Sequence, residues 1–388
     1  MQTPYYVIRK NILDELFFEL KRALDKCWPN YKIGYSFKTN SLPWIIKYMK
    51  ELGTYAEVVS KDEYELAMKL DFGSKVIYNG PVKSKESFCD AIERGCVVNI
   101  DSKREVDWLI EWKKNNPGKN IKSIGIRVNF DLEKYCPGET QCGSEGGRFG
   151  FCYENGELSM VIDTLTQEGI KIAGLHLHCS SKTRSLNIYK AIATVCCDVI
   201  EEHELSLDYV DIGGGFFGGV KGKPGFTDYI EVVAKILKEK CKIENTQIIV
   251  EPGMCLIGAS VDYVTSVVDI KDTTYNRFVL IDGSRTNIDP LMSKKSYLYE
   301  IVLAENDRKI IEKQIISGYT CMENDRLFIA EEVKEFKVGD QIIFKKVGAY
   351  TMCLTPLFIE YFPDVYVEDG NGLVNVRERW TADKILES

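Results

Sequence analysis

The chain has few histidines, no excess of positive charge and no long apolar run. Its 388 residues contain only His176, His178 and His203, which leaves few candidates for histidine-based metal or triad chemistry. Lys and Arg total 50 against 58 Asp and Glu, and the net charge of -8 repels phosphate backbones and anionic membrane surfaces. No apolar run reaches the roughly eighteen residues of a transmembrane helix, and residues 1–10 have the pattern of a strand rather than of a targeting leader. We therefore expect no nucleic-acid partner, no membrane partner and, by default, a cytoplasmic protein.

Cysteine is abundant, but the spacing C-x-x-C is absent. The chain has 13 cysteines, a high and odd number. Without C-x-x-C neither a zinc ribbon nor a thioredoxin-type motif is supported, and we expect no metal site. We expect most of the cysteines to be reduced, buried and apolar in character, with one or two left for chemistry.

Short apolar, β-rich runs alternate with longer amphipathic segments from about residue 30 to residue 255. The longer segments, such as 42–52 and 186–202, have apolar residues three and four positions apart, as amphipathic helices do. Eight such runs fit a (β/α)8 barrel, although an open doubly wound sheet gives the same alternation. The runs are 33–37, 55–59, 76–78, 97–100, 124–128, 172–178, 209–212 and 248–250.

After Val261 the pattern changes to short strand candidates separated by turn residues, without a long helical pattern. This change favours a separate β domain, to which the N-terminus adds a strand at 5–9 and an amphipathic helix at 11–23. We expect a barrel domain of residues 26–260 and a β-sandwich-like or β-barrel-like domain of residues 1–25 and 261–388. Its further strand candidates are 264–270, 278–282, 297–303, 314–317, 340–346, 364–368 and 373–376.

Polar residues gather where the strands of the predicted barrel end. In such a barrel the loops after the strands converge on one face, and that face carries the active site. The fifth run is followed by a long loop, 133–148, which either covers this face or is a surface excursion. The polar residues at the strand ends are Lys38, Glu57, Asn79, Arg127, His178, Asp211 and Glu251.

Three features at these strand ends each have an ordinary alternative. A triple glycine after the seventh run lets backbone N–H groups approach a phosphate, or is only a flexible turn. Lys38 is either a solvated surface cation or an amine in a barrel mouth that condenses with an aldehyde. His178 is either a core histidine or a ring for stacking. Together with Glu251 they suit pyridoxal 5′-phosphate, which needs a lysine, phosphate donors and a carboxylate for its ring nitrogen.

Six motifs carry a more specific signal, and they span almost the whole chain. They are Tyr35-Ser36-Phe37-Lys38-Thr39-Asn40, His178-Cys179-Ser180-Ser181, Asp211-Ile212-Gly213-Gly214-Gly215-Phe216, Glu251-Pro252-Gly253, Gly318-Tyr319-Thr320-Cys321 and Gly348-Ala349-Tyr350. In this order the motifs make the sequence resemble the fold type III, alanine-racemase-like pyridoxal-phosphate decarboxylases. This group includes the diaminopimelate and ornithine decarboxylases.

The resemblance implies a barrel plus a β domain, in a homodimer whose two active sites are each completed by the partner's β domain. It implies that Lys38 bonds to the cofactor, that His178 stacks on the ring and that Glu251 pairs with the ring nitrogen. Cys321 is similar to the cysteine that reaches across the dimer and returns a proton to Cα after carbon dioxide has left. The other cofactor residues that it implies are Glu57 and Arg127 in support, with Ser181, Gly213, Gly214, Gly215, Gly253 and Tyr350 at the phosphate.

Three departures from the family pattern concern the substrate. Family members commonly have arginine after Glu-Pro-Gly, where this chain has Met254, so one cation is missing from the cofactor or substrate region. They commonly have an acidic residue directly after the active cysteine for a distal ammonium, whereas Met322 stands there and leaves Glu323 or Asp325 to substitute. Asp289 stands where diaminopimelate decarboxylases carry an arginine, so it either attracts a cationic or hydroxyl-bearing group or is a turn residue before a proline.

The sequence therefore predicts a pyridoxal-phosphate-dependent carboxy-lyase acting on an ornithine-like, lysine-like or derivatised amino acid rather than on diaminopimelate. We expect Asp289, Glu323 and Tyr350 to contact this small-molecule substrate. Two alternatives stay open, an amino-acid racemase or epimerase and a catalytically silent regulatory binder. The Gly-x-x-Cys and Gly-Ala-Tyr motifs look like those of decarboxylases rather than racemases, and retention of the lysine, glutamate and cysteine argues against a silent binder.

Overall fold

The chain separates into two units in the computed structural model, which describes residues 1–387. We name residues 17–255 the barrel unit, and residues 1–16 with 256–387 the sheet unit. Helix α1 (Lys10–Cys27) contains the first boundary between them. The predicted domain division, residues 26–260 against residues 1–25 with 261–388, stays a prediction.

Eight parallel strands of the barrel unit close into a ring. Closure is complete because β2 pairs with β3 on one side and with β10 on the other, and β5 pairs with β6. The eight predicted runs coincide with these strands, so the predicted (β/α)8 barrel is confirmed and the doubly wound sheet is excluded. The strands are β2 (Tyr31–Ser36), β3 (Tyr55–Val58), β4 (Val76–Tyr78), β5 (Val97–Ile100), β6 (Ile124–Asn129), β8 (Gly174–His176), β9 (Tyr209–Asp211) and β10 (Gln247–Val250).

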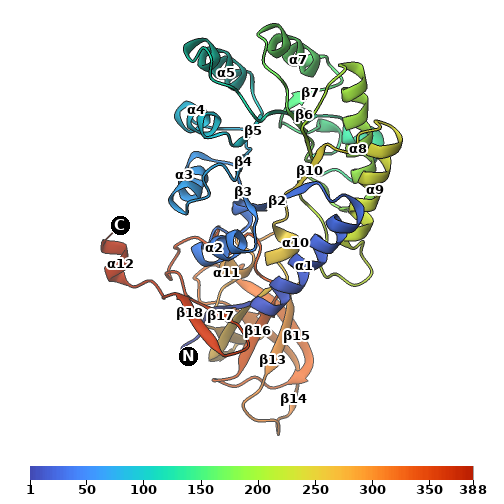
Figure 1. Ribbon diagram of the computed structural model, residues 1–388. Helices are drawn as coiled ribbons and strands as arrows, with labels where there is room; N and C mark the ends of the chain where they lie inside the picture. Colours follow the sequence, from blue (N-terminus) through green and yellow to red (C-terminus); the bar gives the residue numbers. More distant parts are fainter. Residues whose placement is uncertain (388) are drawn as a thin grey trace. The chain divides into compact units, whose positions relative to one another are not determined.

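Amphipathic helices connect these strands and lie outside the ring (Figure 1). Side-chain hydrogen bonds cap the first turn of two of these helices. The Ser60 side chain accepts a hydrogen bond from the amide of Glu63, and the Ser84 side chain accepts one from the amide of Ser87. The helices of the barrel unit are α2 (Pro43–Glu51), α3 (Lys61–Lys69), α4 (Lys85–Arg94), α5 (Lys103–Asn115), α7 (Glu157–Gln167), α8 (Leu186–Glu202) and α9 (Phe226–Glu239). No helix within residues 1–387 is long and apolar enough to cross a membrane.

Short elements follow three of the barrel strands. The predicted long loop after β6 contains α6 (Leu132–Tyr135) and the 3-10 turn η2 (Gly143–Glu145), and strand β7 (Phe151–Cys152) follows it beside β6. The 3-10 turn η1 (Phe37–Thr39) follows β2, and α10 (Met254–Ile257) begins after β10.

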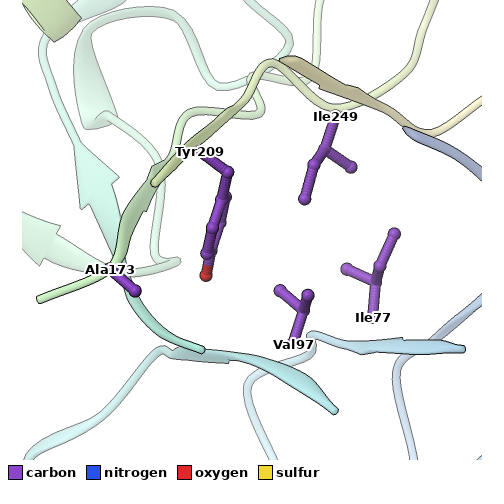
Figure 2. Close-up of a cluster of buried hydrophobic side chains, with 5 residues drawn as sticks. All are labelled: Ile77, Val97, Ala173, Tyr209 and Ile249. Carbon is purple, nitrogen blue, oxygen red and sulfur yellow. The ribbon is translucent and has the colours of Figure 1, made fainter. Parts of the chain in front are cut away.

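The inside of the ring is filled by side chains from different strands, so the barrel is a packed core. Figure 2 shows the buried cluster Ile77, Val97, Ala173, Tyr209 and Ile249. A Cβ atom on Gly125 would lie 2.2 Å from the hydroxyl oxygen of Tyr209, and one on Gly174 would lie 2.2 Å from a ring carbon of the same side chain. Glycine at both positions therefore leaves the space that the Tyr209 ring occupies. The hydroxyl of Tyr209 donates a hydrogen bond to Asn99 Oδ1 at 2.7 Å.

A disulfide joins Cys197 on α8 to Cys241, which follows α9. The two helices bring the Cα atoms to 5.3 Å, within the range that a disulfide spans. The expectation of reduced cysteines is therefore wrong for this pair. The expectation that most cysteines are buried is wrong, since burial is found for Cys96, Cys136, Cys196, Cys197 and Cys255, while Cys142 and Cys353 are free and exposed. Cys321, which the resemblance assigns to chemistry, is also free and exposed.

The sheet unit is built on a nine-stranded mixed sheet. Its long strand β11 pairs with β1, β12 and β16, and β1 lies between β11 and the parallel β17. The unit also has the short helices α11 (Arg285–Ile288) and α12 (Ala382–Leu386). Its strands are β1 (Tyr5–Arg9), β11 (Val261–Asp272), β12 (Arg277–Ile281), β13 (Leu298–Val302), β14 (Ile310–Ser317), β15 (Arg326–Lys334), β16 (Gln341–Lys345), β17 (Asp364–Glu368) and β18 (Leu373–Arg377).

Strand β15 has no counterpart among the predicted strands, whereas each of the other strands of the sheet unit has one. Three charged residues, Glu331, Glu332 and Lys334, stand in the second half of β15 and are exposed. These charges conceal the apolar alternation from which the other strands are predicted.

A buried ion pair fixes the loop after β4. The Nζ of Lys83 lies 2.9 Å from Oε2 of Glu105, and both side chains are fully buried. The same ammonium donates to the carbonyl oxygens of Gly80 and Asn99. Desolvation lowers the pKa of Lys83 and raises the pKa of Glu105, so each charge depends on the other.

We expect Lys83→Met to lower the free energy of unfolding by about 3–5 kcal/mol, because it leaves a buried carboxylate without its partner. Adding Glu105→Leu should recover most of this loss, since the buried charge is then gone. Lys85, in an exposed 2.7 Å pair with Glu111, provides the control, and Lys85→Met should cost less than about 1 kcal/mol. Urea unfolding measures all three variants, and equal losses for the two single variants would contradict the account.

Candidate active site

Lys38 lies at the carboxyl end of β2, on the 3-10 turn η1. Its Nζ is 2.8 Å from Oε2 of Glu57, which stands in β3, and Ser36 Oγ donates to the same oxygen at 2.6 Å. The Glu57 side chain is 1% exposed, whereas that of Lys38 is 38% exposed. A buried carboxylate thus holds the amine at the end of the barrel while the amine stays accessible.

Two buried asparagines link the carboxylates of Glu57 and Glu251. Asn79, which follows β4, donates from Nδ2 to Oε1 of Glu57 at 3.1 Å and to Oε1 of Glu251. Its Oδ1 accepts from Nδ2 of Asn99 at 2.8 Å. Asn99 in turn accepts from the hydroxyl of Tyr209, whose ring belongs to the barrel core. Because both N–H bonds and the oxygen of the Asn79 amide are used, Asn79 fixes the two carboxylates relative to each other.

Glu251, at the end of β10, is 5% exposed and lies beside His176 and Asp211. Nε2 of His176 is 3.7 Å from Oε2 of Glu251. Burial disfavours a charge on Glu251, but His176 and Lys38 outweigh it and hold the pKa of this carboxyl below its usual range. Burial and the neighbouring Glu251 raise the pKa of Asp211 well above its usual range. The opposite directions of the two shifts favour the negative charge on Glu251 rather than on Asp211. That the chain has no metal site stays a prediction.

His178 follows β8 and presents a neutral ring. The amide of Gly214 donates to its Nδ1 at 3.3 Å. Burial and the nearby Arg127 lower the pKa of His178 to about 3. A flat imidazole that stays uncharged at neutral pH suits stacking on an aromatic ligand.

The glycine turn after β9 requires glycine at each position. Gly213 and Gly215 have φ of 67° and 93°, in the left-handed region that favours glycine. A Cβ atom on Gly214 would lie 2.2 Å from the carbonyl oxygen of Glu251, and one on Gly213 would lie 2.5 Å from Nδ1 of His178. The turn thus packs directly on both residues, and at the exposed Gly215 its backbone offers a close approach to a phosphate.

Arg127 on β6 supports this end of the barrel. It pairs with Asp101 at 3.2 Å, donates to the carbonyl oxygen of His178 at 3.4 Å, and lies 4.7 Å from the ring centroid of Phe149. Asp101 also accepts the amide of Gly150 at 3.1 Å, so the arginine and the aspartate hold the end of the long loop.

The long loop after β6 also lines a cavity of about 580 Å³. Its lining includes Asn129, Glu133, Arg148 and Phe149, together with His178. Of the two alternatives for this loop, the structure favours a wall beside the site over a plain surface excursion.

The turn that carries Cys321 follows β14 in the sheet unit. Cys321 is exposed and free, and the side chain of Glu323 is 95% exposed. Asp325 is 2% exposed, and its carboxylate accepts from Ser284 Oγ at 3.0 Å and from the amide of Thr320 at 3.1 Å. Asp325 therefore holds the turn, whereas Glu323 is presented outward.

Asp289 is 3% exposed and its carboxylate is fully engaged. It pairs with Arg285 at 3.1 Å, accepts the amides of Ser293 and Lys294, and accepts the hydroxyl of Tyr297 at 3.0 Å. The structure thus favours the turn alternative for Asp289 over contact with the substrate. Tyr350, also in the sheet unit, has a φ of 55°.

The predicted site residues divide between the two units. Contacts within the barrel unit connect Lys38, Glu57, Arg127, His178, Ser181, Gly213, Gly214, Gly215, Glu251 and Gly253. Cys321, Glu323, Asp289 and Tyr350 belong to the sheet unit.

Four further buried residues belong to the network: Asn79, Asn99, His176 and Asp211. The sequence places Asn79 and Asp211 at strand ends without giving them a role, and Asn99 and the contact of His176 with Glu251 were missed. Each lies in or directly after a barrel strand, and that position was the available signal.

Four features of the barrel unit suit pyridoxal phosphate. They are the accessible amine of Lys38, the neutral ring of His178, the buried carboxylate of Glu251 and the close-packed glycine turn. Residues 15–258 match the family model described as pyridoxal-dependent decarboxylase, pyridoxal binding domain. The chain belongs to the pyridoxal-dependent decarboxylases. The resemblance predicted from the motifs is confirmed, pyridoxal phosphate is the cofactor, and the enzyme is a carboxy-lyase.

Relatives of this decarboxylase carry different substrate names. It is 27% identical over 393 residues to the diaminopimelate decarboxylase of Aquifex aeolicus, covering 99% of this chain and 91% of that protein. The diaminopimelate decarboxylase of Methanocaldococcus jannaschii has the same fold, with a TM-score of 0.87 at 23% identity over 100% of this chain and 92% of that one. The arginine decarboxylase of Paramecium bursaria Chlorella virus has a TM-score of 0.78 at 19% identity, over 95% and 96% of the two chains. These likenesses leave the substrate of this decarboxylase open.

We expect the unliganded decarboxylase to lose stability as the pH falls from about 6.5 toward 3. In that window an ordinary, unfolded histidine binds a proton, whereas folded His178 stays neutral until about pH 3. The stability that His178 contributes is thus complete above about pH 6.5 and declines below it, by about 2 kcal/mol at pH 5.

His178→Phe keeps a flat ring and removes this titration. Urea unfolding at pH 7 and pH 5 should therefore show a smaller loss for the variant than for the parent protein. Parallel losses in the two proteins would contradict a neutral His178.

Proposed function

We propose that the protein decarboxylates an ornithine-like, lysine-like or derivatised amino acid, whose distal end lacks the second carboxylate of diaminopimelate. The outward carboxylate of Glu323, two residues after Cys321, carries this proposal. An exposed acidic side chain beside the proposed proton donor suits a cationic substrate end.

The other two acidic residues considered for substrate binding already make hydrogen bonds within the protein. Asp289 and Asp325 are buried and saturated with hydrogen bonds from their own unit. Among residues 1–387, Glu323 pairs only with Arg326, at 3.1 Å in an exposed contact that a substrate ammonium can replace at little cost.

Pyridoxal phosphate supplies an aldehyde that bonds to amines and a ring that takes up the electron pair of the broken carbon–carbon bond. We assign Lys38 to the aldehyde and His178 to the ring face. Glu57 holds the lysine amine in place, at 2.8 Å. Glu251, ionised by its surroundings, holds a proton on the ring nitrogen. We assign the phosphate to Ser181, Gly213, Gly214, Gly215, Gly253 and Tyr350.

We further propose a homodimer in which Cys321 and Tyr350 of one subunit complete the partner's site. An exposed apolar segment of the sheet unit supports it, since contiguous apolar surface on a protein commonly marks an interface. Its side chains, between 39% and 53% exposed, are Leu354, Leu357, Phe358, Ile359 and Tyr361. The segment begins four residues after Tyr350.

Release of carbon dioxide from ornithine, lysine, diaminopimelate, carboxyspermidine and acylated amino acids tests the substrate class. We expect a substrate whose distal end carries an ammonium and no carboxylate to be decarboxylated faster than diaminopimelate, whose distal carbon carries both groups. Faster turnover of diaminopimelate would contradict the proposal. Interconversion of enantiomers without carbon dioxide would favour the racemase alternative.

Replacing Glu323 by Gln should raise KM for the distal-ammonium substrate by about tenfold with little change in kcat, because it removes one charge-assisted contact. Glu305→Gln is the matched control, since Glu305 is another exposed glutamate of the same unit, paired with Lys337 at 3.4 Å. Equal effects of the two substitutions, or none for Glu323→Gln, would remove Glu323 from substrate recognition.

Cys321→Ala should keep the visible absorbance of the holoenzyme and misdirect the return of the proton to Cα, because Cys321 is exposed and its loss disturbs no buried contact. Decarboxylation in deuterium oxide measures this as a loss of stereochemical purity at the deuterated product carbon. Lys38→Ala should instead abolish the absorbance. Unchanged rate and product stereochemistry in Cys321→Ala would exclude it as the donor.

A further inference from the structure

Arg184, in the loop between β8 and α8, is held in an unusual backbone conformation. Its φ is 51°, in the left-handed region that side chains other than those of asparagine and aspartate rarely adopt. Its amide donates to Ser181 Oγ at 3.0 Å, and its carbonyl oxygen accepts the hydroxyl of Tyr229 at 2.7 Å. A disfavoured backbone that neighbouring side chains stabilise on both sides is typical of a functional position.

The guanidinium of Arg184 lies between two turns of the proposed phosphate site. Its Nη2 is 2.8 Å from Sδ of Met254, the residue that follows Gly253. Its Cζ is 5.1 Å from the ring centroid of Phe217, two residues after Gly215. The contacts thus place a cation where the Glu-Pro-Gly turn and the glycine turn come together.

This cation has no counter-charge of its own. Within residues 1–387, no carboxylate lies within 4.0 Å of the Arg184 guanidinium, whose neighbours are a thioether and an aromatic ring. Neither group neutralises a positive charge, so the half-buried guanidinium is available to an anion.

One aromatic pair connects Arg184 to the glycine turn. The hydroxyl of Tyr189, on α8, donates to the carbonyl oxygen of Gly214 at 2.7 Å. Its ring packs edge-on against Tyr229 on α9, with centroids 4.7 Å apart, and Tyr229 holds the carbonyl of Arg184. The turn and the arginine are therefore positioned by the same two side chains.

We propose that Arg184 binds the phosphate dianion of the cofactor and supplies the cation that Met254 does not. The proposal rests on the assignment of the phosphate to the glycine turn made above. A planar guanidinium offers several N–H donors to a phosphate, and charge-assisted hydrogen bonds of this kind are the strongest that a side chain makes.

Pyridoxal, which lacks the phosphate, provides the matched ligand for the test. Titrating the apoenzyme with each ligand and following the visible absorbance gives two dissociation constants. We expect Arg184→Met to weaken binding of pyridoxal phosphate by about 10-fold to 100-fold and binding of pyridoxal by less than about 3-fold. Arg184→Lys should recover part of the loss, and Met254→Arg in the Arg184→Met background should recover most of it.

Lys223 is the matched control, because its Nζ lies 5.4 Å from the centroid of the same Phe217 ring and its side chain is exposed. Lys223→Met should leave both dissociation constants unchanged. A larger effect of Lys223→Met than of Arg184→Met would overturn the proposal.

Two further outcomes would also overturn the role of Arg184. Unchanged binding of pyridoxal phosphate in Arg184→Met would do so while leaving the cofactor site intact. Equal weakening for both ligands would show that the arginine acts on the fold and not on the phosphate. If the phosphate assignment itself were wrong, the unsubstituted protein would bind pyridoxal and pyridoxal phosphate equally well, which separates the two failures.

Discussion

The buried carboxylate of Glu251 is the constraint on which the end of the barrel depends. A carboxylate that is only 5% exposed persists as an anion only where neighbouring groups stabilise it. Asn79 donates to Glu251, His176 lies 3.7 Å from it, and burial beside Glu251 raises the pKa of Asp211, which favours the negative charge on Glu251. Residues at the ends of four strands thus surround and stabilise one carboxylate.

The same network sets the spacing of the reactive groups. Asn79 donates to the carboxylate that holds the Lys38 amine and to Glu251, so one amide orients the two ends of the proposed cofactor site. Behind it, Asn99 and the hydroxyl of Tyr209 connect the polar network to the packed interior of the barrel. Because the polar groups are bonded to one another, their positions follow from the rigid core and not from mobile loops.

The sequence predicts the barrel well because each buried strand is a short apolar run bounded by helical periodicity. Strand β15 was not predicted, because Glu331, Glu332 and Lys334 interrupt its apolar pattern. The motifs identify Lys38 and Glu251 singly, but the contact of both carboxylates with Asn79 joins residues 172 positions apart and needs the folded chain. Cys197 and Cys241 likewise pair only because α8 and α9 pack together, and Arg184 sits in a polar loop without a recognisable pattern.

The protonation state of the cofactor ring nitrogen tests most directly whether the charge on Glu251 organises the site. Holoenzyme reconstituted with pyridoxal phosphate labelled with ¹⁵N in the ring reports that state through its ¹⁵N chemical shift. The account predicts a protonated ring nitrogen from pH 6 to pH 9 in the unsubstituted enzyme and an unprotonated one in Glu251→Gln. An unprotonated nitrogen in the unsubstituted enzyme, or the same shift in both proteins, would contradict it.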